Sequence, residues 1–267
     1  VSNEPETAQD DKQHDEADST IGLSTKTLSG IQSLPRGAEP GVLVHALLEQ
    51  CAYLGFQTAQ SSPELRGQLI NKIFSHSTWD NKRDIIATAL TQWLNMPLLE
   101  NADVRLCDLS PDQYQAELEF LLGANNVDVY ALDQLVTQHT FAGKPRPRLL
   151  RVQVHGLLKG FIDLVFVHNQ QYYVADYKFN GLGNDDAAYT QETLVAAMLD
   201  KRYDLQYALY LLALHRLLKT RLGNDYDYDK HIGGSLYLFL RGINAPTYGR
   251  VFDKPDKLFI EHLDSLF

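Results

Sequence analysis

Two apolar segments separated by a short polar turn constrain the fold of this 267-residue chain most strongly. Residues 160–167 and 172–179 are rich in Val, Ile, Leu, Phe and Tyr, and the polar stretch 168–171 joins them. These residue types prefer strands, and a four-residue polar connection is typical of a β-hairpin. We therefore predict two buried antiparallel strands in the core of the molecule.

Two acidic residues face each other in this predicted hairpin. If Val167 pairs with Tyr172 across the turn, Asp163 and Asp176 lie directly opposite each other. Lys178 follows Asp176 by two residues and therefore lies on the same face. Like charges opposed on an apolar sheet are destabilising unless a cation lies between them. The pattern therefore predicts a divalent metal site.

A structural ion pair is the alternative explanation of these charges. Asp-x-Lys triplets occur twice elsewhere in polar parts of the chain, so the triplet alone is not specific. An ion pair of Asp176 with Lys178 or with Lys159 would neutralise the carboxylate without any metal.

The rest of the chain has mixed helical and strand patterns. Apolar residues at helical spacing predict helices over residues 41–54, 62–76, 80–97, 128–138, 189–222 and 255–266. Apolar runs predict further strands over residues 114–122, 149–158 and 233–241. This order predicts an α/β fold with a short, mixed central sheet flanked by helices.

The charge is concentrated at the N-terminal end of the sequence. The first 20 residues contain seven acids and one lysine, a net charge of −6, which leaves −4 for the other 247 residues. We predict a disordered acidic tail or interdomain linker over residues 1–32 and a folded domain over residues 33–267. The nearly neutral body is compatible with a nucleic-acid partner, provided that the basic residues cluster locally.

Several classes of protein are excluded by residues that the chain lacks. Its two cysteines, Cys51 and Cys107, exclude a disulfide scaffold and any four-thiolate zinc or iron–sulfur site within it. No phosphate-binding Gly-x-x-x-x-Gly-Lys-Ser/Thr motif is present, so the chain carries no ATP-driven motor of its own. It opens with Val-Ser and shows neither a signal-peptide pattern nor a membrane span, which predicts a cytoplasmic segment of a longer polypeptide.

Four segments carry a resemblance to a known family. They are residues 34–49 with His45, 156–166 with Asp163, 172–180 with Asp176 and Lys178, and 202–210 with Gln206 and Tyr210; residues 233–242 add to them. In this order they resemble the RecB-type nucleases of the PD-(D/E)XK superfamily, the C-terminal nuclease domains of RecBCD helicase–nucleases. The resemblance covers residues 33–267. It implies a restriction-endonuclease-like fold and a metal-dependent deoxyribonuclease of the exodeoxyribonuclease V type.

The resemblance also implies a role for each matching residue. His45, Asp163, Asp176 and the backbone carbonyl of Tyr177 would hold Mg²⁺, and Asp163, Asp176 and Lys178 would be catalytic. Mn²⁺ and Ca²⁺ would fit the same site, although no cleavage is expected with Ca²⁺. Lys178 would orient the attacking water or help to deprotonate it. A histidine satisfied within an apolar helix face remains the alternative for His45.

Further residues are expected near this site. Gln206 and Tyr210 are one helical turn apart and would contact the DNA backbone or Lys178, although packing and hydrogen bonding within the fold explain Tyr210 equally well. Of the nearby pair Glu117 and Glu119, we expect Glu117 to be a supporting or second-metal acid. The sequence departs from the family at Phe179, where the family has a small Ser or Thr. This departure affects a minor polar contact and not the metal site.

The expected partners follow from the same resemblance. They are DNA, preferably single-stranded, an upstream RecB helicase, RecC-like and RecD-like subunits, and a RecA recombinase, with no membrane. The function implied is hydrolysis of DNA strands in double-strand-break repair and in the degradation of linear DNA. The alternatives are a protein-docking module that recruits a RecA-like recombinase and an inactive DNA-binding paralogue. The presence of all the expected catalytic residues argues against the second alternative.

Overall fold

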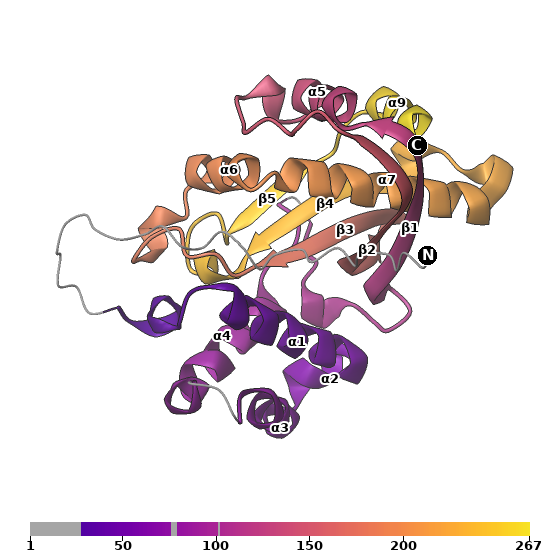
Figure 1. Cartoon of the computed structure of the whole chain (residues 1–267). Helices are drawn as coiled ribbons and strands as arrows, with labels where there is room; N and C mark the ends of the chain where they lie inside the picture. Colours follow the sequence, from indigo (N-terminus) through magenta and orange to yellow (C-terminus); the bar gives the residue numbers. More distant parts are fainter. Residues whose placement is uncertain (1–27, 76–78, 101) are drawn as a thin grey trace, which may run out of the picture.

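A five-stranded sheet between two layers of helices forms the structure, a computed structural model that describes residues 28–75, 79–100 and 102–267 (Figure 1). The tail predicted over residues 1–27 lies outside the described residues. The strands are β1 (Tyr114–Asp128), β2 (Gln153–His168), β3 (Gln171–Lys178), β4 (Ile232–Phe239) and β5 (Arg250–Asp253), in this spatial order. β3 and β4 are parallel and the other neighbours are antiparallel, so the sheet is mixed, as predicted.

The helices divide into two layers that cover opposite faces of the sheet (Figure 1). One layer contains α1 (Ala38–Leu54), α2 (Phe56–Ser61), α3 (Pro63–Phe74) and α4 (Arg83–Asn95). The other contains α5 (Val129–His139), α6 (Gln191–Asp200), α7 (Tyr203–Leu222), α8 (Tyr228–His231) and α9 (Lys257–Leu266). Short 3₁₀ turns lie at Gly30–Ser33, Asp80–Lys82, Leu106–Asp108, Phe141–Gly143, Asp186–Ala188, Gly223–Asp225 and Leu240–Gly242. None of the described helices has the length and apolarity needed to cross a membrane.

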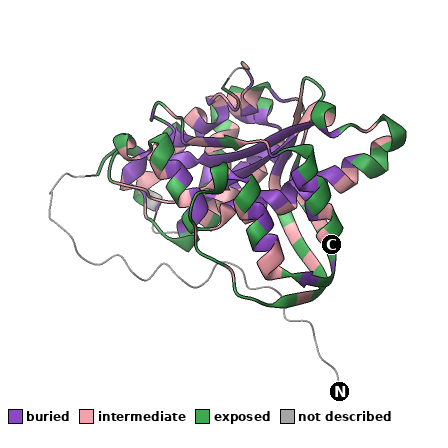
Figure 2. Cartoon of the chain, turned by 90° about the horizontal axis from the view of Figure 1, so that it is seen from above, coloured by how far each residue is buried: buried purple, intermediate pink, exposed green. Residues whose placement is uncertain are grey.

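The buried residues gather in the central strands between these layers (Figure 2). Every residue of β4 is buried, and β3 is buried over most of its length. The central strands are therefore covered on both faces, which explains why their sequences are apolar runs without alternation.

The predicted hairpin register is confirmed from the turn to Leu164 and Ala175, and the next expected pair, Asp163 with Asp176, is not part of the ladder. β2 and β3 pair from His168 and Gln171 at the turn to Leu164 and Ala175. The segments predicted on either side of Gly160 form one strand, whose first residue is Gln153. A Cβ atom at Gly160 would lie 2.5 Å from the Phe120 ring of β1. The glycine therefore allows a close cross-strand contact and does not interrupt the strand.

The features that were not predicted include the short helices α2 and α8, a break in the helical region 189–222, and strand β5. The apolar region over residues 189–222 is divided into α6 and α7 by Arg202, whose φ angle is +56°. The apolar periodicity of residues 189–222 continues through this break, so the sequence did not indicate that the helix ends there. β5 has only four residues, which pair antiparallel with β4.

A buried arginine anchors the chain that leads into α1. The Arg241 side chain is completely buried and donates hydrogen bonds to the carbonyls of Ile31 (3.2 Å), Leu34 (3.2 Å) and Pro35. It also donates to the carbonyl of Phe179 at the end of β3, at 3.0 Å. Ile31, which falls inside the region expected to be a linker, is therefore packed against the folded domain.

Phe179 occupies the core on the face of the sheet covered by α1–α4. Its ring lies 6.1 Å from the rings of both Trp79 and Trp93, and the Arg241 guanidinium lies 4.1 Å above it. The bulky residue at this position thus fills a cavity between helices, and the neighbouring Lys178 faces the opposite layer.

Replacing Arg241 by Met should destabilise the fold. The change leaves buried carbonyls without a donor, so we expect the free energy of unfolding to fall by about 3 kcal/mol. Urea denaturation measures this change. Arg221→Met at the exposed end of α7 is the matched control, with an expected change below about 0.5 kcal/mol. An unchanged midpoint for Arg241→Met would contradict the anchoring role.

His215 of α7 predicts a pH dependence of stability. It is buried with Nδ1 2.8 Å from the Tyr226 hydroxyl, and burial lowers its pKa below the ordinary value of 6.5. As the pH falls through 6.5, the unfolded chain takes up this proton before the folded chain does, so stability is lost. Unfolding free energies at about pH 7.5 and about pH 5.5 should therefore differ more for the wild type than for His215→Gln. Equal losses in the two proteins would refute this role.

Candidate active site

Asp163 lies where β2 and β3 diverge. The two strands are paired from the turn as far as Leu164 and Ala175. The next residue on each strand, Asp163 or Asp176, lies beyond this pairing. At this point Asp163 accepts a hydrogen bond on Oδ2 from the backbone N–H of Tyr177, at 2.7 Å. A side-chain carboxylate thus satisfies a buried backbone donor where the strands separate.

His45 approaches Asp163 from α1. Its Nδ1 lies 3.4 Å from Asp163 Oδ2, and its side chain is 32% exposed while that of Asp163 is 12% exposed. The imidazole edge also meets the ring of Tyr177, at 6.0 Å between ring centres. The predicted histidine therefore lies beside the predicted carboxylate, at the rim of the site.

Asp176 and Lys178 form a buried ion pair on β3. Lys178 Nζ lies 2.8 Å from Asp176 Oδ2, with side-chain exposures of 11% and 3%. The same ammonium donates to Gln206 Oε1 of α7 at 3.1 Å and lies 4.1 Å from the centre of the Tyr203 ring. Lys178 is thus held by an acid, an amide and an aromatic face.

Gln206 and Tyr210 connect this ion pair to α7. Gln206 Nε2 donates to the Tyr210 hydroxyl at 2.9 Å, and that hydroxyl donates to Asp176 Oδ1 at 3.4 Å. The hydroxyl of Tyr237 on β4 donates to Gln206 Oε1 at 2.8 Å. These contacts form a closed circuit of hydrogen bonds and an ion pair around Lys178, and a structural role of Tyr210 through packing and hydrogen bonding agrees with them as well.

The pKa values of the two aspartates are shifted in opposite directions. Burial opposes the ionised form of Asp163, but His45 and the Tyr177 N–H outweigh it and lower the pKa below the ordinary value. Burial raises the pKa of Asp176 to about 6, against the effect of Lys178. For His45, burial lowers the pKa, but the attraction of Asp163 is stronger and raises the pKa to about 9.

Glu117 lies beside Asp163 and Glu119 does not. The neighbours of Glu117 pair as Ala116 with Leu164 and Leu118 with Ile162, which places Glu117 across from Asp163. Its φ angle of +48° lies in the left-handed region, which residues other than glycine rarely adopt. Burial raises its pKa to about 7, with additional contributions from Asp163 and from Glu49 of α1. Glu119 points outward and pairs with Lys159 at 3.0 Å.

Two tyrosines of the site were not predicted as site residues. Tyr203 is one turn before Gln206 on α7, and Tyr237 pairs in register with Asp176 on β4. Helical spacing could have identified the first. The second depends on the parallel pairing of β3 with β4, which links residues far apart in sequence.

The donors in this site suit a hard divalent cation. Two buried carboxylates and an imidazole lie together, and oxygen-rich sites of this kind bind Mg²⁺ or Mn²⁺. In the described part of the chain, no three His, Cys, Asp or Glu side chains converge closely enough to hold an ion in the present arrangement. The acids are paired with His45 and Lys178, which neutralise them.

Comparison with known proteins identifies the family. Residues 22–262 match the model of the PD-(D/E)XK nuclease superfamily. The chain belongs to this superfamily. Nucleases of this superfamily use divalent metal ions, which agrees with the donor set.

The chain is also similar to the RecB subunit of RecBCD enzymes. It is 40% identical to RecB of Escherichia coli over 239 residues, which are 87% of this chain and 19% of the relative. It is 35% identical to RecB of Haemophilus influenzae over 97% of this chain and 21% of the relative. RecB of Mycobacterium tuberculosis is 32% identical over 83% of this chain and 22% of the relative. The chain spans about a fifth of the length of these relatives.

Removing Lys178 should destabilise the protein through Asp176. In the presence of a chelator and at about pH 8, Lys178→Met leaves the Asp176 carboxylate buried without its cation, a loss of about 3 kcal/mol. The double variant Asp176→Asn/Lys178→Met removes both charges and should recover most of this loss. Urea denaturation of the two single variants and the double variant measures the coupling. A double variant no more stable than Lys178→Met would contradict this electrostatic account.

Proposed function

We propose that this chain is the DNA nuclease domain of a RecBCD-type helicase–nuclease. It hydrolyses phosphodiester bonds of DNA, preferably in single strands, during double-strand-break repair and the degradation of linear DNA. One observation carries the proposal: His45, Asp163, Asp176 and Lys178 meet where β2 and β3 diverge, in a chain similar to RecB.

His45, Asp163, Asp176 and the backbone carbonyl of Tyr177 would hold Mg²⁺. When bound, the cation would lower the pKa of a water molecule and neutralise charge on the scissile phosphate. His45 of α1 lies 3.4 Å from Asp163, at the point where β2 and β3 diverge, and Asp176 is buried beside this point on β3. The chain thus supplies the ligands from three elements, α1, β2 and β3.

Lys178 would stabilise the charge that develops on the phosphate and orient the attacking water. Its ammonium is surrounded by a carboxylate, an amide oxygen and a tyrosine ring, all of which favour the charged form. Gln206 fixes the direction of Lys178 and is fixed in turn by Tyr210 and Tyr237. α7 therefore aligns the lysine with the acids of the sheet.

The partners follow from the names of the relatives. These are RecB subunits of RecBCD enzymes, so we infer that an upstream helicase and RecC-like and RecD-like subunits deliver the DNA. RecA recruitment and a cytoplasmic location remain predictions of the sequence. An inactive DNA-binding paralogue is not favoured, because the acids, the histidine and the lysine of the site are present together.

Cleavage of a labelled single-stranded oligonucleotide tests the proposal. The wild type should cut it with Mg²⁺ and not with EDTA, and Asp176→Ala should lower the rate by at least about 100-fold, because a cation ligand is lost. Asp200→Asn, which removes an exposed charge of α6, is the control and should cut at the wild-type rate.

Cleavage that survives Asp176→Ala would overturn the assignment of the site. Absence of cleavage by the wild type in both single-stranded and double-stranded DNA, with Mg²⁺ or Mn²⁺, would overturn independent nuclease activity of this chain.

A further inference from the structure

A basic segment leads directly into the site. Residues 144–161, here called the basic segment, contain five lysines and arginines and no acidic residue, although the whole chain has a net charge of −10. Lys144, Arg148, Arg151 and Lys159 in this segment are exposed. The segment ends two residues before Asp163. Lys159, the cation of the segment nearest to Asp163 along the chain, pairs with Glu119. Lys144, Arg148 and Arg151 carry the remaining exposed charge, at the end of the segment that precedes β2.

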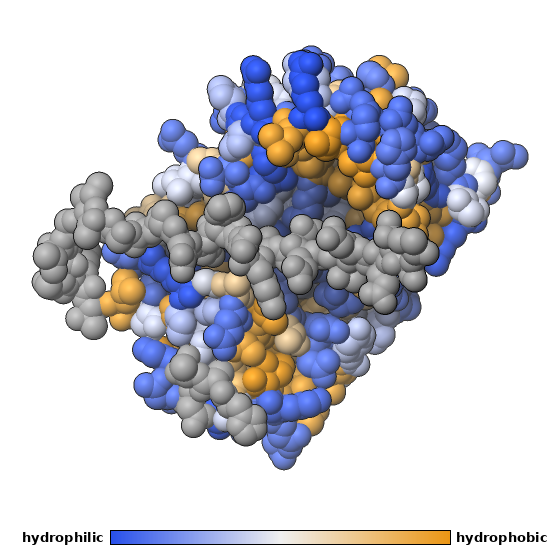
Figure 3. Space-filling view, in the orientation of Figure 1, coloured by the Kyte–Doolittle hydropathy of each residue, from blue (hydrophilic) through white to orange (hydrophobic). Residues whose placement is uncertain are grey.

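The same segment exposes large apolar side chains. Leu150 is 80% exposed, Leu157 is 64% exposed and Phe161 is 44% exposed, and Leu121 of β1 pairs beside them, opposite Lys159. Figure 3 shows hydrophobic surface next to long hydrophilic side chains on the upper part of the molecule. A surface that alternates cations with apolar groups matches a ligand that carries both phosphates and flat apolar faces.

Buried charges anchor the irregular part of this segment. Residues 144–152 form neither helix nor strand. The Arg146 side chain is nevertheless buried, with its guanidinium 2.8 Å from Asp204 and in contact with Thr140. Arg202 donates to the carbonyl of Pro147 at 2.7 Å and pairs with Asp133 at 2.6 Å. Buried ion pairs carry a large desolvation cost, so their presence beneath an irregular segment indicates that its position matters.

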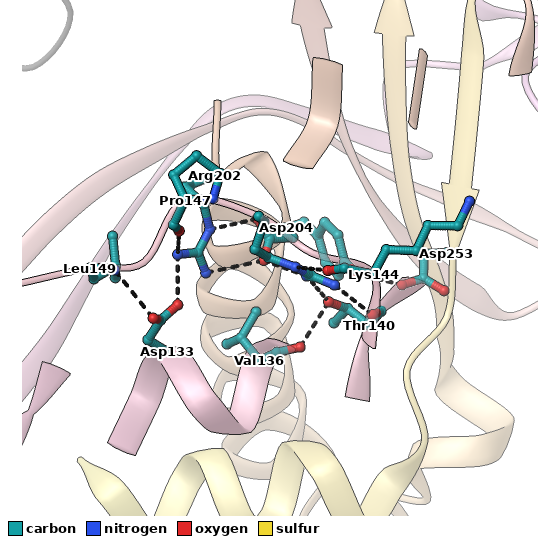
Figure 4. A network of polar contacts seen from close by, with 11 residues as sticks. Asp133, Val136, Thr140, Lys144, Pro147, Leu149, Arg202, Asp204 and Asp253 are labelled. Atoms are coloured by element: carbon teal, nitrogen blue, oxygen red, sulfur yellow. Dashed lines mark hydrogen bonds and ion pairs between the residues drawn. The ribbon is translucent and has the colours of Figure 1, made fainter. Parts of the chain in front are cut away.

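These anchors also belong to the start of α7. Arg202 immediately precedes α7, and Asp204 is in its first turn. Gln206 and Tyr210, which hold Lys178 and Asp176, follow on the same helix. The network in Figure 4 therefore fixes the basic segment relative to the catalytic lysine.

We propose that the basic segment is a track for single-stranded DNA leading to the active site. Arg148 and Arg151 bind phosphates, and Leu150, Leu157 and Phe161 contact the bases. Duplex DNA fits this surface less well, because its base faces are stacked inside the helix and cannot reach the apolar side chains. That the bound strand leads to an active site rests on the proposed function. Binding of DNA to the basic segment is measured separately from cleavage.

Binding of a fluorescent oligonucleotide of about 20 nucleotides, followed by anisotropy in EDTA, tests the track without cleavage. Arg148→Ala/Arg151→Ala removes two phosphate contacts. Each contact contributes a salt slope of about 0.7, so the slope should fall by about 1.4 and Kd at about 0.1 M salt should rise about 25-fold. The control Lys219→Ala/Arg221→Ala removes the same charge from the exposed end of α7, and its Kd should stay within about twofold.

A second variant tests the apolar contacts. Leu150→Ser/Leu157→Ser changes side chains that are mostly exposed, so the fold should be retained. Its Kd for the single strand should rise about tenfold, with an unchanged salt slope. Its affinity for a duplex of the same length should stay the same.

Unchanged single-strand binding in both variants would overturn the track. Loss of association with a RecC-like subunit while DNA binding persists would also overturn it and would make this surface a protein interface. Failure of the proposed function is read from a different assay, hydrolysis of thymidine 5′-p-nitrophenyl phosphate with Mg²⁺. This small ester does not extend along the track, so the two failures are distinguishable.

Discussion

The burial of two carboxylates where two paired strands diverge is the constraint on which the rest of this structure depends. Asp163 and Asp176 repel each other, and the low polarity of their surroundings opposes their ionised forms. Each is compensated from a different helical layer: His45 of α1 lies against Asp163, and Gln206 and Tyr210 of α7 support Lys178 beside Asp176. Both layers are therefore needed to assemble the site.

Buried arginines determine where these two helices begin. Arg241 holds the chain before α1 against the end of β3, and Arg202 holds the start of α7 through Asp133 and Asp204. Neither arginine touches the carboxylates of the site. The positions of His45 and Gln206 nevertheless depend on them, because each helix is fixed at the end nearest its anchor. Stability and function are thus linked through interactions remote from the chemistry.

The sequence was most informative where interactions are local. The turn after β2 fixes the hairpin register, and this register brings Asp163, Asp176 and Lys178 together without knowledge of the remaining fold. Features set by distant contacts could not be predicted. Arg202 lies between α6 and α7, held by Asp133 and Asp204, while the apolar periodicity continues unchanged through the break. Tyr237 lies in an apolar run that is typical of a core strand. Only the parallel pairing of β3 with β4 brings its hydroxyl to Gln206. Glu117 lies across from Asp163 and Glu119 pairs with Lys159, and the positive φ angle of Glu117 is a feature that its residue type does not signal.

The most direct test of the central claim is a crystal structure of the chain with Mn²⁺, located by its anomalous scattering. The account predicts a peak bounded by His45, Asp163 and Asp176, and its loss in Asp163→Asn. A peak elsewhere on the protein, or one that remains after Asp163→Asn, would contradict it.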